Sequence, residues 1–281
     1  MPGIAEALLR HGADPDLQGE HMSSKLTVLE VAVCKCSLPL VSLLLKFHAN
    51  PNTFGSSRDR FNNTYKYFPL WYAVNNNAPG IVQILLDYGA NPNYSLLWSA
   101  VNDNAPDIVK SLLDYGSNPT SELLCTAVDR NFKDIVSLLF SYGVDPDVLN
   151  SNRTPAIFLC LENTSILRLF ICQGCNVNAI NRKGYTPMEE AIRNAHWEHA
   201  RMLWDAGSKI GKTYTWISNK TIPWKKDYGD AMKSAVYEYL NDMLTGTPMS
   251  LMDISRIAIR RHLGNDLPSK TKLLEIPTQQ N

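Results

Sequence analysis

Two groups of residues have types and spacings that occur in metal and thiol chemistry. Cys172 and Cys175 are separated by two residues (Cys-x-x-Cys), which is the spacing of half a zinc site. His196 and His199 lie close together further along the chain. A zinc site needs a second pair of ligands, and none follows Cys175 at the usual distance. The histidines lack the His-Glu-x-x-His order of metalloproteases. We therefore expect packing roles, with no catalytic residue, metal or cofactor, and metal analysis of the purified chain tests the catalytic alternative.

These residues lie inside a segment that recurs six times. Each copy contains Leu-x-x-Ala-Val, then an apolar Ile/Leu-Val-x-x-Leu-Leu run, then Gly-Ala-Asn-Pro-Asn or a close variant. The separation from the first position to the turn position is nineteen residues in five copies, and Ala156 to Gly174 is one residue shorter. Repeats with a period of about 20 to 50 residues stack, so that each unit buries its apolar face against its neighbours. Such a stack presents an extended surface, which predicts binding rather than catalysis.

Each copy is expected to form two short helices. Leu70, Ala73 and Val74 share one face of a first helix, and Pro79 suits the first turn of a second helix. Gly89 then stands where a left-handed helix end is required. The chain also starts inside a repeat, because residues 4–9 resemble a second helix without a first one. We interpret this as a truncated or short-isoform start.

Composition narrows the class of protein. The 281 residues carry 27 Lys and Arg against 27 Asp and Glu, so no overall charge draws the chain to nucleic acid or to an anionic membrane. No apolar run is long enough to span a bilayer, and the start lacks the basic and apolar regions of a secretory signal. Six cysteines in such a chain are expected to be reduced thiols, which favours a cytoplasmic and possible nuclear location.

The repeats resemble ankyrin repeats over about residues 1–210. The clearest copy, residues 182–192, is close to the family pattern Asp-x-x-Gly-x-Thr-Pro-Leu-His-x-Ala-Ala. The resemblance implies an all-α fold: a solenoid of about six full helix pairs and an N-terminal half repeat. The family histidine is replaced in every copy, so we expect its local hydrogen bond to be lost and packing to take its place. The replacing residues are Glu30, Trp71, Trp98, Cys125, Ile157 and Glu189.

The register of the family assigns a concave face and a set of connecting fingers. The finger from His48 to Leu70 is the longest, and loops of unusual length on a rigid scaffold often carry function. It is either a ligand-contacting loop or a surface insertion. Trp71 and Trp98 are either binding anchors or fillers of the space left by the family histidine. The predicted target-binding residues are Trp71, Tyr72, Asn75, Asn76, Trp98, Asn102, Asp103, Asp129, Arg130, Glu162, Arg193 and Asn194.

The repeat pattern stops after Gly207. Residues 211–247 are rich in aromatic side chains, and 230–244 have helical periodicity, so we expect them to cap the last repeat. Residues 248–281 form a third predicted domain. It begins with Ser250-x-x-Asp253, a helix-starting pattern. An apolar stripe of helical spacing follows, and it suits either the groove of a partner or the chain's own last repeat. Its members are Leu251, Ile254, Ser255, Ala258, Ile259, His262 and Leu263.

Residues 249–264 resemble the SOCS box, whose first helix has the form Ser/Pro-Leu-x-x-x-Cys-x-x-x-Ile. The resemblance implies that an Elongin C-binding helix is present, with Ser255 at the family cysteine. Its members are Leu251, Ile254, Ser255, Ala258 and Ile259. The second half of the box offers a Leu-Pro-x-Pro element to cullin-5. Here Leu273, Ile276 and Pro277 match it in part, and Gln279 replaces the second proline.

Ankyrin repeats followed by this element resemble the ankyrin repeat and SOCS box family. The resemblance implies a substrate-recognition subunit of an Elongin B/C–cullin-5 RING E3 ubiquitin ligase that has no catalytic residues of its own. The ankyrin repeats hold an unknown target protein in this interpretation, and the SOCS box docks Elongin B/C and cullin-5. The alternative is an ankyrin interaction scaffold or inhibitor that does not direct degradation.

Overall fold

The computed structural model describes residues 2–21, 24–55, 57–58, 64–65, 67–209 and 211–224, with 233–234, 236–238 and 240–241. The chain divides into two compact units, Met1–Asn152 and Arg153–Asn281. This division lies inside the segment predicted to be the ankyrin domain. In the described part of the chain, no helix has both the length and the apolar character needed to cross a membrane.

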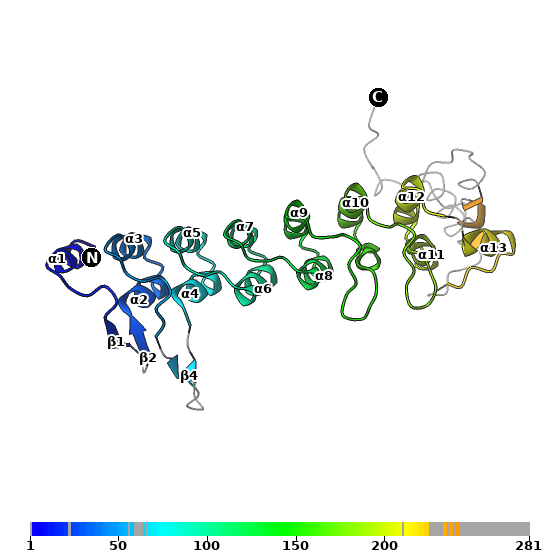
Figure 1. Cartoon of the computed structure of the whole chain (residues 1–281). Helices are drawn as coiled ribbons and strands as arrows, with labels where there is room; N and C mark the ends of the chain where they lie inside the picture. The colour runs from blue at the N-terminus through cyan, green and yellow to red at the C-terminus, as the bar shows by residue number, and fades with distance from the viewer. Residues whose placement is uncertain are drawn as a thin grey trace, which may run out of the picture. The chain divides into compact units, whose positions relative to one another are not determined.

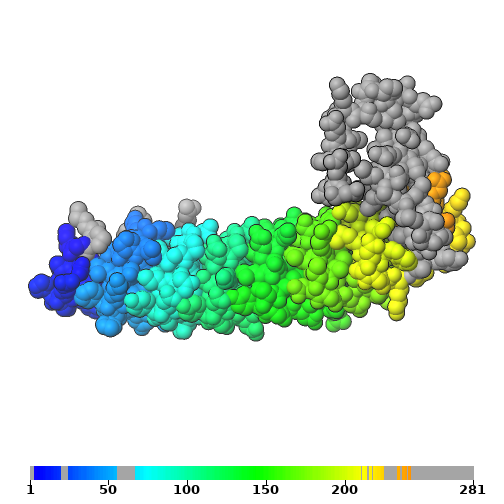
Figure 2. Space-filling view, turned by 90° about the horizontal axis from the view of Figure 1, so that it is seen from above, coloured from blue at the N-terminus to red at the C-terminus, as the bar shows by residue number. Residues whose placement is uncertain are grey.

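The first unit consists of helices in two rows (Figure 1). The first helices of successive repeats contact one another and are α2 (Val28–Cys34), α4 (Pro69–Asn75), α6 (Tyr94–Asn102) and α8 (Ser121–Asp129). The second helices form the other row and are α1 (Pro2–Arg10), α3 (Leu38–Lys46), α5 (Pro79–Asp87), α7 (Pro106–Asp114) and α9 (Lys133–Ser141). Within this unit the colours follow chain order from α1 to α9 in the space-filling view, as expected when each repeat packs on its neighbours in sequence (Figure 2).

The predicted helix pairs and the N-terminal half repeat are confirmed. Helix α1 packs against α3, as a second helix without its own first helix must. Leu97 and Val101 of α6 are fully buried, as is Leu112 of α7. Burying an aliphatic side chain contributes about 1.5–3 kcal/mol, so stacking rather than helix propensity holds these nine-residue helices. Gly89 ends α5 with φ +85°, as its position predicted.

Fingers connect the repeats. The first is an antiparallel hairpin of β1 (Gln18–His21) and β2 (Ser24–Thr27), in which Gln18 pairs with Thr27. The long finger contains β3 (Ser57–Arg58), which pairs with β4 (Thr64–Tyr65). In Figure 1 both hairpins extend from the side of the unit that carries α2 and α4. The predicted tip at residues 59–63 lies outside the described residues.

The second unit contains the last two repeats and the segment that follows them. Its elements are the 3₁₀ helix η1 (Ala156–Cys160) and the α-helices α10 (Thr164–Cys172), α11 (Pro187–Arg193), α12 (Trp197–Asp205) and α13 (Lys212–Ser218). The first helix of the shorter copy is a 3₁₀ helix rather than an α-helix. This copy is one residue shorter, and a 3₁₀ helix rises about 2.0 Å per residue instead of about 1.5 Å, so it spans the distance with fewer residues.

The expectation that every copy loses the local hydrogen bond of the family histidine was also wrong. The Glu30 carboxylate accepts from the backbone N–H of Thr27 at 2.6 Å, and the Thr27 hydroxyl accepts from the Glu30 N–H at 3.1 Å. Thr186 and Glu189 form the same reciprocal cap on α11. Each glutamate also reaches the next connection: Glu30 accepts from the Gly55 N–H at 2.9 Å, and Glu189 from the Lys212 N–H at 2.8 Å. These carboxylates therefore tie each helix start to the chain segment beside it.

Candidate functional site

The predicted concave face of the first unit is a polar row that crosses α4, α6 and α8. Asn75, Asn102 and Asp129 recur at intervals of 27 residues at the ends of these helices. The Ser99 hydroxyl donates to Asn75 Oδ1 at 3.1 Å, and Arg130 Nη1 donates to the backbone carbonyl of Asn102 at 3.1 Å. Contacts between repeats therefore brace the row, in which Asn75 and Asp129 are exposed and the side-chain amide of Asn102 is buried. Asn76, Asp103 and Arg130 stand at the helix ends beside it and are exposed.

Aromatic side chains gather where the long finger enters α4. The Tyr67 and Trp71 rings stack with centroids 3.8 Å apart, and Tyr72 meets Trp71 edge-on at 5.1 Å. Partial burial, followed by the nearby Glu30 and Cys34, raises the pKa of Tyr72 to about 12. Trp71 therefore packs within a cluster of rings.

Trp98 has a different environment, although it occupies the equivalent position one repeat later. Its side chain is 45% exposed on α6, so it does not fill space left by the family histidine. Tyr94, one turn earlier, is 41% exposed, and its hydroxyl donates to Glu122 Oε2 at 3.0 Å. The structure thus separates the two tryptophans that the sequence placed together: Trp71 is half-buried and Trp98 is open.

The predicted target-binding residues of the second unit also differ among themselves. Glu162 is exposed, whereas Asn194 is half-buried at the end of α11. The Arg193 guanidinium lies 4.2 Å from the centroid of the Tyr185 ring. It donates to Glu190 Oε2 at 2.8 Å and to the Pro223 carbonyl at 3.0 Å. Arg193 therefore holds residues 221–224 to the last repeat, a role that its register position did not reveal.

Replacing Arg193 with alanine is expected to lower the free energy of unfolding by about 3 kcal/mol. The Arg193 and Glu190 side chains are only 12% and 11% exposed, and removing one partner of a buried ion pair leaves the other charge uncompensated. Urea denaturation measures the loss. Arg201→Ala is the matched control, because the pair of Arg201 with Asp205 is exposed and is expected to contribute less than about 0.5 kcal/mol. Equal losses of stability in the two variants would contradict the structural role of the buried Arg193–Glu190 pair.

Where the structure describes it, the aromatic segment after the last repeat packs against α12. Trp224 lies edge-on to Trp197 at 6.0 Å and to Tyr237 at 6.4 Å. The Ile222 N–H donates to the Tyr237 hydroxyl at 3.1 Å, and Val236 and Leu240 are fully buried. The predicted Elongin C-binding residues Leu251, Ile254, Ser255, Ala258 and Ile259 and the predicted cullin-binding residues Leu273, Ile276 and Pro277 lie outside the described residues.

The cysteines and histidines with metal-like spacing are separate features of the structure. All six cysteines are free thiols, with Cys172 exposed at the end of α10 and Cys175 buried. Within the described residues, no three histidine, cysteine or acidic side chains are grouped as metal ligands would be. The His196 and His199 rings are 5.6 Å apart. Burial and then the neighbouring His196 lower the pKa of His199, with a partly opposing effect of Glu198.

Acidification is therefore expected to destabilise the second unit through His199. A lowered pKa in the folded state gives stability that is present above the unfolded value of 6.5 and is lost as the pH falls below it. Between pH 7.5 and 5.5 this group contributes a loss of at most about 1.4 kcal/mol. Urea denaturation at both pH values measures it, and His199→Gln is expected to show a smaller difference. An identical difference in wild type and variant would remove His199 as the cause.

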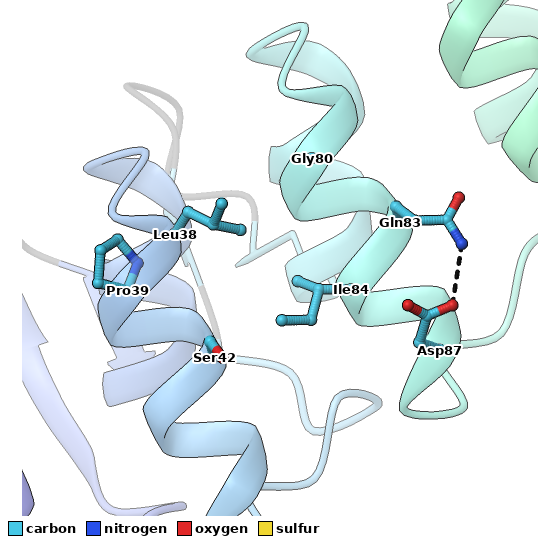
Figure 3. A pocket seen from close by; sticks show the side chains of 7 residues that line it. All are labelled: Leu38, Pro39, Ser42, Gly80, Gln83, Ile84 and Asp87. Atoms are coloured by element: carbon cyan, nitrogen blue, oxygen red, sulfur yellow. Dashed lines mark hydrogen bonds between the residues drawn. The ribbon is translucent and has the colours of Figure 1, made fainter.

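A groove that sequence reasoning did not identify lies between the second helices α3 and α5. Its volume is about 450 Å³, and it is lined on α3 by Leu38, Pro39 and Ser42. Figure 3 shows the Leu38 side chain extending towards α5. The remaining lining residues are Gly80, Gln83, Ile84 and Asp87. The sequence signal is the absent side chain at Gly80, because the equivalent positions of the next two repeats are Asp107 and Asp134. Asp87 accepts hydrogen bonds from Gln83 and from Tyr115 of the next repeat, so this rim is fixed.

Comparison with known proteins identifies both parts of the chain. The ankyrin repeat family model matches residues 1–95, 55–122 and 124–214, and the SOCS box model matches residues 247–279. The chain belongs to the ankyrin repeat and SOCS box family. The predicted all-α ankyrin fold and the position of the SOCS box in the sequence are thereby confirmed.

Relatives of this ankyrin repeat and SOCS box protein agree on the fold. This chain is 38% identical over 88 residues to the putative ankyrin repeat protein FPV014 of fowlpox virus (strain NVSL). The match covers 31% of this chain and 18% of that protein. The ankyrin domain of Bcl-3 is similar with a TM-score of 0.51 and 24% identity, over 65% of this chain and 87% of that one. The human ASB11 ankyrin repeat domain has a TM-score of 0.50 and 19% identity, over 66% and 86%.

Proposed function

We propose that the chain is a substrate-recognition subunit of a cullin–RING ubiquitin ligase, assembled through Elongin B/C and cullin-5. The observation that carries the proposal is the combination, in one chain, of a SOCS box at residues 247–279 with ankyrin repeats over residues 1–214. The repeats present a braced polar and aromatic surface on α4, α6 and α8. A SOCS box gives the same chain a means of joining a ligase.

The chain contributes positioning rather than chemistry in this proposal. Holding a target beside a ubiquitin-loaded enzyme converts an encounter between two molecules into a reaction within one assembly. The target lysines then meet the enzyme at an effective concentration set by the geometry of the assembly. Ubiquitin transfer itself belongs to the other subunits, so the protein is an adaptor.

The sequence assigns the contacts of the SOCS box within this proposal. Leu251 and Ile259 are expected to enter an apolar groove of Elongin C, with Ser255 between them. The Ser255 hydroxyl costs about 1 kcal/mol or more when buried, unless it donates to a carbonyl one turn earlier in its own helix. Ile276 and Pro277 are expected to contact cullin-5, and Gln279 stands where the family has a second proline.

Copurification tests the proposal. The full chain, expressed with Elongin B, Elongin C and cullin-5, is expected to elute with all three proteins in one size-exclusion peak. Capture of Elongin B/C without cullin-5 would remove the cullin-5 assignment and leave an Elongin-binding protein. Failure to capture Elongin B/C would overturn the proposal in favour of an ankyrin scaffold that does not direct degradation.

A further inference from the structure

The two exposed aromatic rings of α6 stand beside a carboxylate of α8. Tyr94 and Trp98 are four residues apart, which places them on one face of the helix. The Tyr94 hydroxyl donates to Glu122 Oε2 at 3.0 Å, so the carboxylate is held on this face. Within the described residues no other ring lies against Trp98, and its side chain is 45% exposed. An open indole and an anchored carboxylate are therefore presented together.

The preceding repeat shows that this openness is specific to α6. Tyr67 and Trp71 occupy the same positions 27 residues earlier, and their rings stack on each other with centroids 3.8 Å apart. Tyr94 is instead directed to Glu122 of the next repeat. The same pair of residue types is thus closed at α4 and open at α6.

The ends of α6 and α8 add negative potential to this face. Asp103 and Asp129 are exposed at the carboxyl-terminal ends of these helices, where the helix dipole disfavours negative charge, and neither helix has a basic residue in its last turn. The neighbouring cation, Arg130, donates to the backbone carbonyl of Asn102. Burial is the main cause that raises the pKa of Cys125 to about 11, and Asp129 and Glu122 raise it further. The negative charge of these two carboxylates therefore extends to the Cys125 thiol in the middle of α8.

The charge of the whole first unit has the same sign. Residues 1–152 contain 10 Lys and Arg against 15 Asp and Glu, a formal net charge of −5. Residues 153–281 contain 17 and 12, a net charge of +5, so the neutral total conceals a division between the two parts. A negative surface favours encounters with cationic partners and disfavours nucleic acid.

We propose that the face formed by α6 and α8 binds a basic, extended segment of the target protein, with one Lys or Arg side chain held over Trp98 and against Glu122. An indole face attracts a cation through its quadrupole, and a carboxylate accepts a charge-assisted hydrogen bond from the same group. Asp103 and Asp129 then attract further basic residues of the segment. The identity of this occupant as a ubiquitination target rests on the proposed function.

A random library of 12-residue peptides displayed on phage tests the charge of the occupant. The full chain is immobilised through an N-terminal tag, so the selection does not depend on Elongin. Lys and Arg are expected to exceed Asp and Glu in the selected peptides. Selected peptides without a cationic excess would overturn the proposal. Elongin B/C capture is measured on the same preparation, so failure of the proposed function and failure of this inference give different results.

Variants then locate the site. A synthetic selected peptide is expected to bind the double variant Trp98→Ala/Glu122→Gln about 10-fold more weakly than it binds the wild-type chain. Acetylation of the peptide's lysines is expected to weaken binding to the wild type by a similar factor. It is expected to have little further effect on binding to the variant. Tyr88→Ala/Asp107→Asn is the matched control, because it removes an exposed ring and an exposed carboxylate outside the first helices. Equal affinity for the wild type and the Trp98/Glu122 variant, or an equal loss in the control, would overturn the proposal.

Discussion

Replacing Leu251 with aspartate is expected to reduce capture of Elongin B/C by the full chain at least about 100-fold. Leu251 belongs to the apolar stripe that we propose enters the Elongin C groove. The substitution removes a buried aliphatic contact, and it places a carboxylate in an apolar groove, where an uncompensated charge costs several kcal/mol. A loss of about 2.7 kcal/mol in binding free energy corresponds to a 100-fold increase in the Kd for Elongin B/C. Titration of purified Elongin B/C by biolayer interferometry measures the change.

Ile257→Asp is the matched control for this prediction. It makes the same change from an apolar to an acidic side chain. In the predicted helix, at about 100° per residue, it is expected to lie nearly opposite the stripe. It is expected to retain capture within about fivefold. Wild-type affinity in Leu251→Asp would exclude the stripe as the contact. Equal loss in both variants would indicate damage to the helix rather than to its binding face.

Replacing Gly55 with alanine is expected to lower the free energy of unfolding by about 3 kcal/mol. A Cβ atom at this position would lie 2.1 Å from the Lys25 carbonyl oxygen and 2.9 Å from the Leu26 Cα, and both are backbone atoms that cannot move independently. It would also lie 2.7 Å from Glu30 Oε2, in the carboxylate that accepts from the Gly55 N–H. The long finger must then move away from β2. The variant is destabilised by the steric overlap and by the loss of the buried hydrogen bond. Urea denaturation measures the loss.

Gly80→Ala provides the control for Gly55→Ala. A Cβ at Gly80 would meet Leu38 Cδ2 at 3.9 Å, an ordinary contact, and alanine is the better helix former in α5. This variant is expected to be neutral or stabilised by up to about 1 kcal/mol. A comparable destabilisation at Gly55 and Gly80 would show that general loss of glycine, rather than the close approach of two backbones, controls the result.

The repeated arrangement of apolar residues made most of the fold predictable from the sequence. Leu97, Val101 and Leu112 are buried because short helices of this pattern can remove their apolar stripe from water only by stacking. Gly89 ended its helix as expected, since the left-handed conformation is cheapest for glycine. The SOCS box was recognised from the resemblance of residues 249–264 to the pattern of that family's first helix.

The candidate site was only partly predictable from the sequence. The position of a residue within the repeat predicts the face of the stack on which it lies, but it does not predict which side chains it contacts. The sequence placed Trp71 and Trp98 in the same class, yet Tyr67 stacks on Trp71, whereas Tyr94 bonds to Glu122 and leaves Trp98 open. Whether the tyrosine stacks on the tryptophan or forms a hydrogen bond depends on the residue that lies beside it in the next repeat. No pattern within a single repeat contains that information.

Contacts between distant segments were decided by the tertiary structure alone. Register placed Arg193 on the binding face, but its guanidinium is held by the Pro223 carbonyl, thirty residues later, and by Glu190. Glu30 was interpreted as a replacement that loses a hydrogen bond, and it bonds instead to both Thr27 and Gly55. The sequence by itself determined the period, the helices and the class of protein, because these follow from local spacing and apolar burial. Hydrogen bonds that close across repeats depend on atoms that only folding brings together.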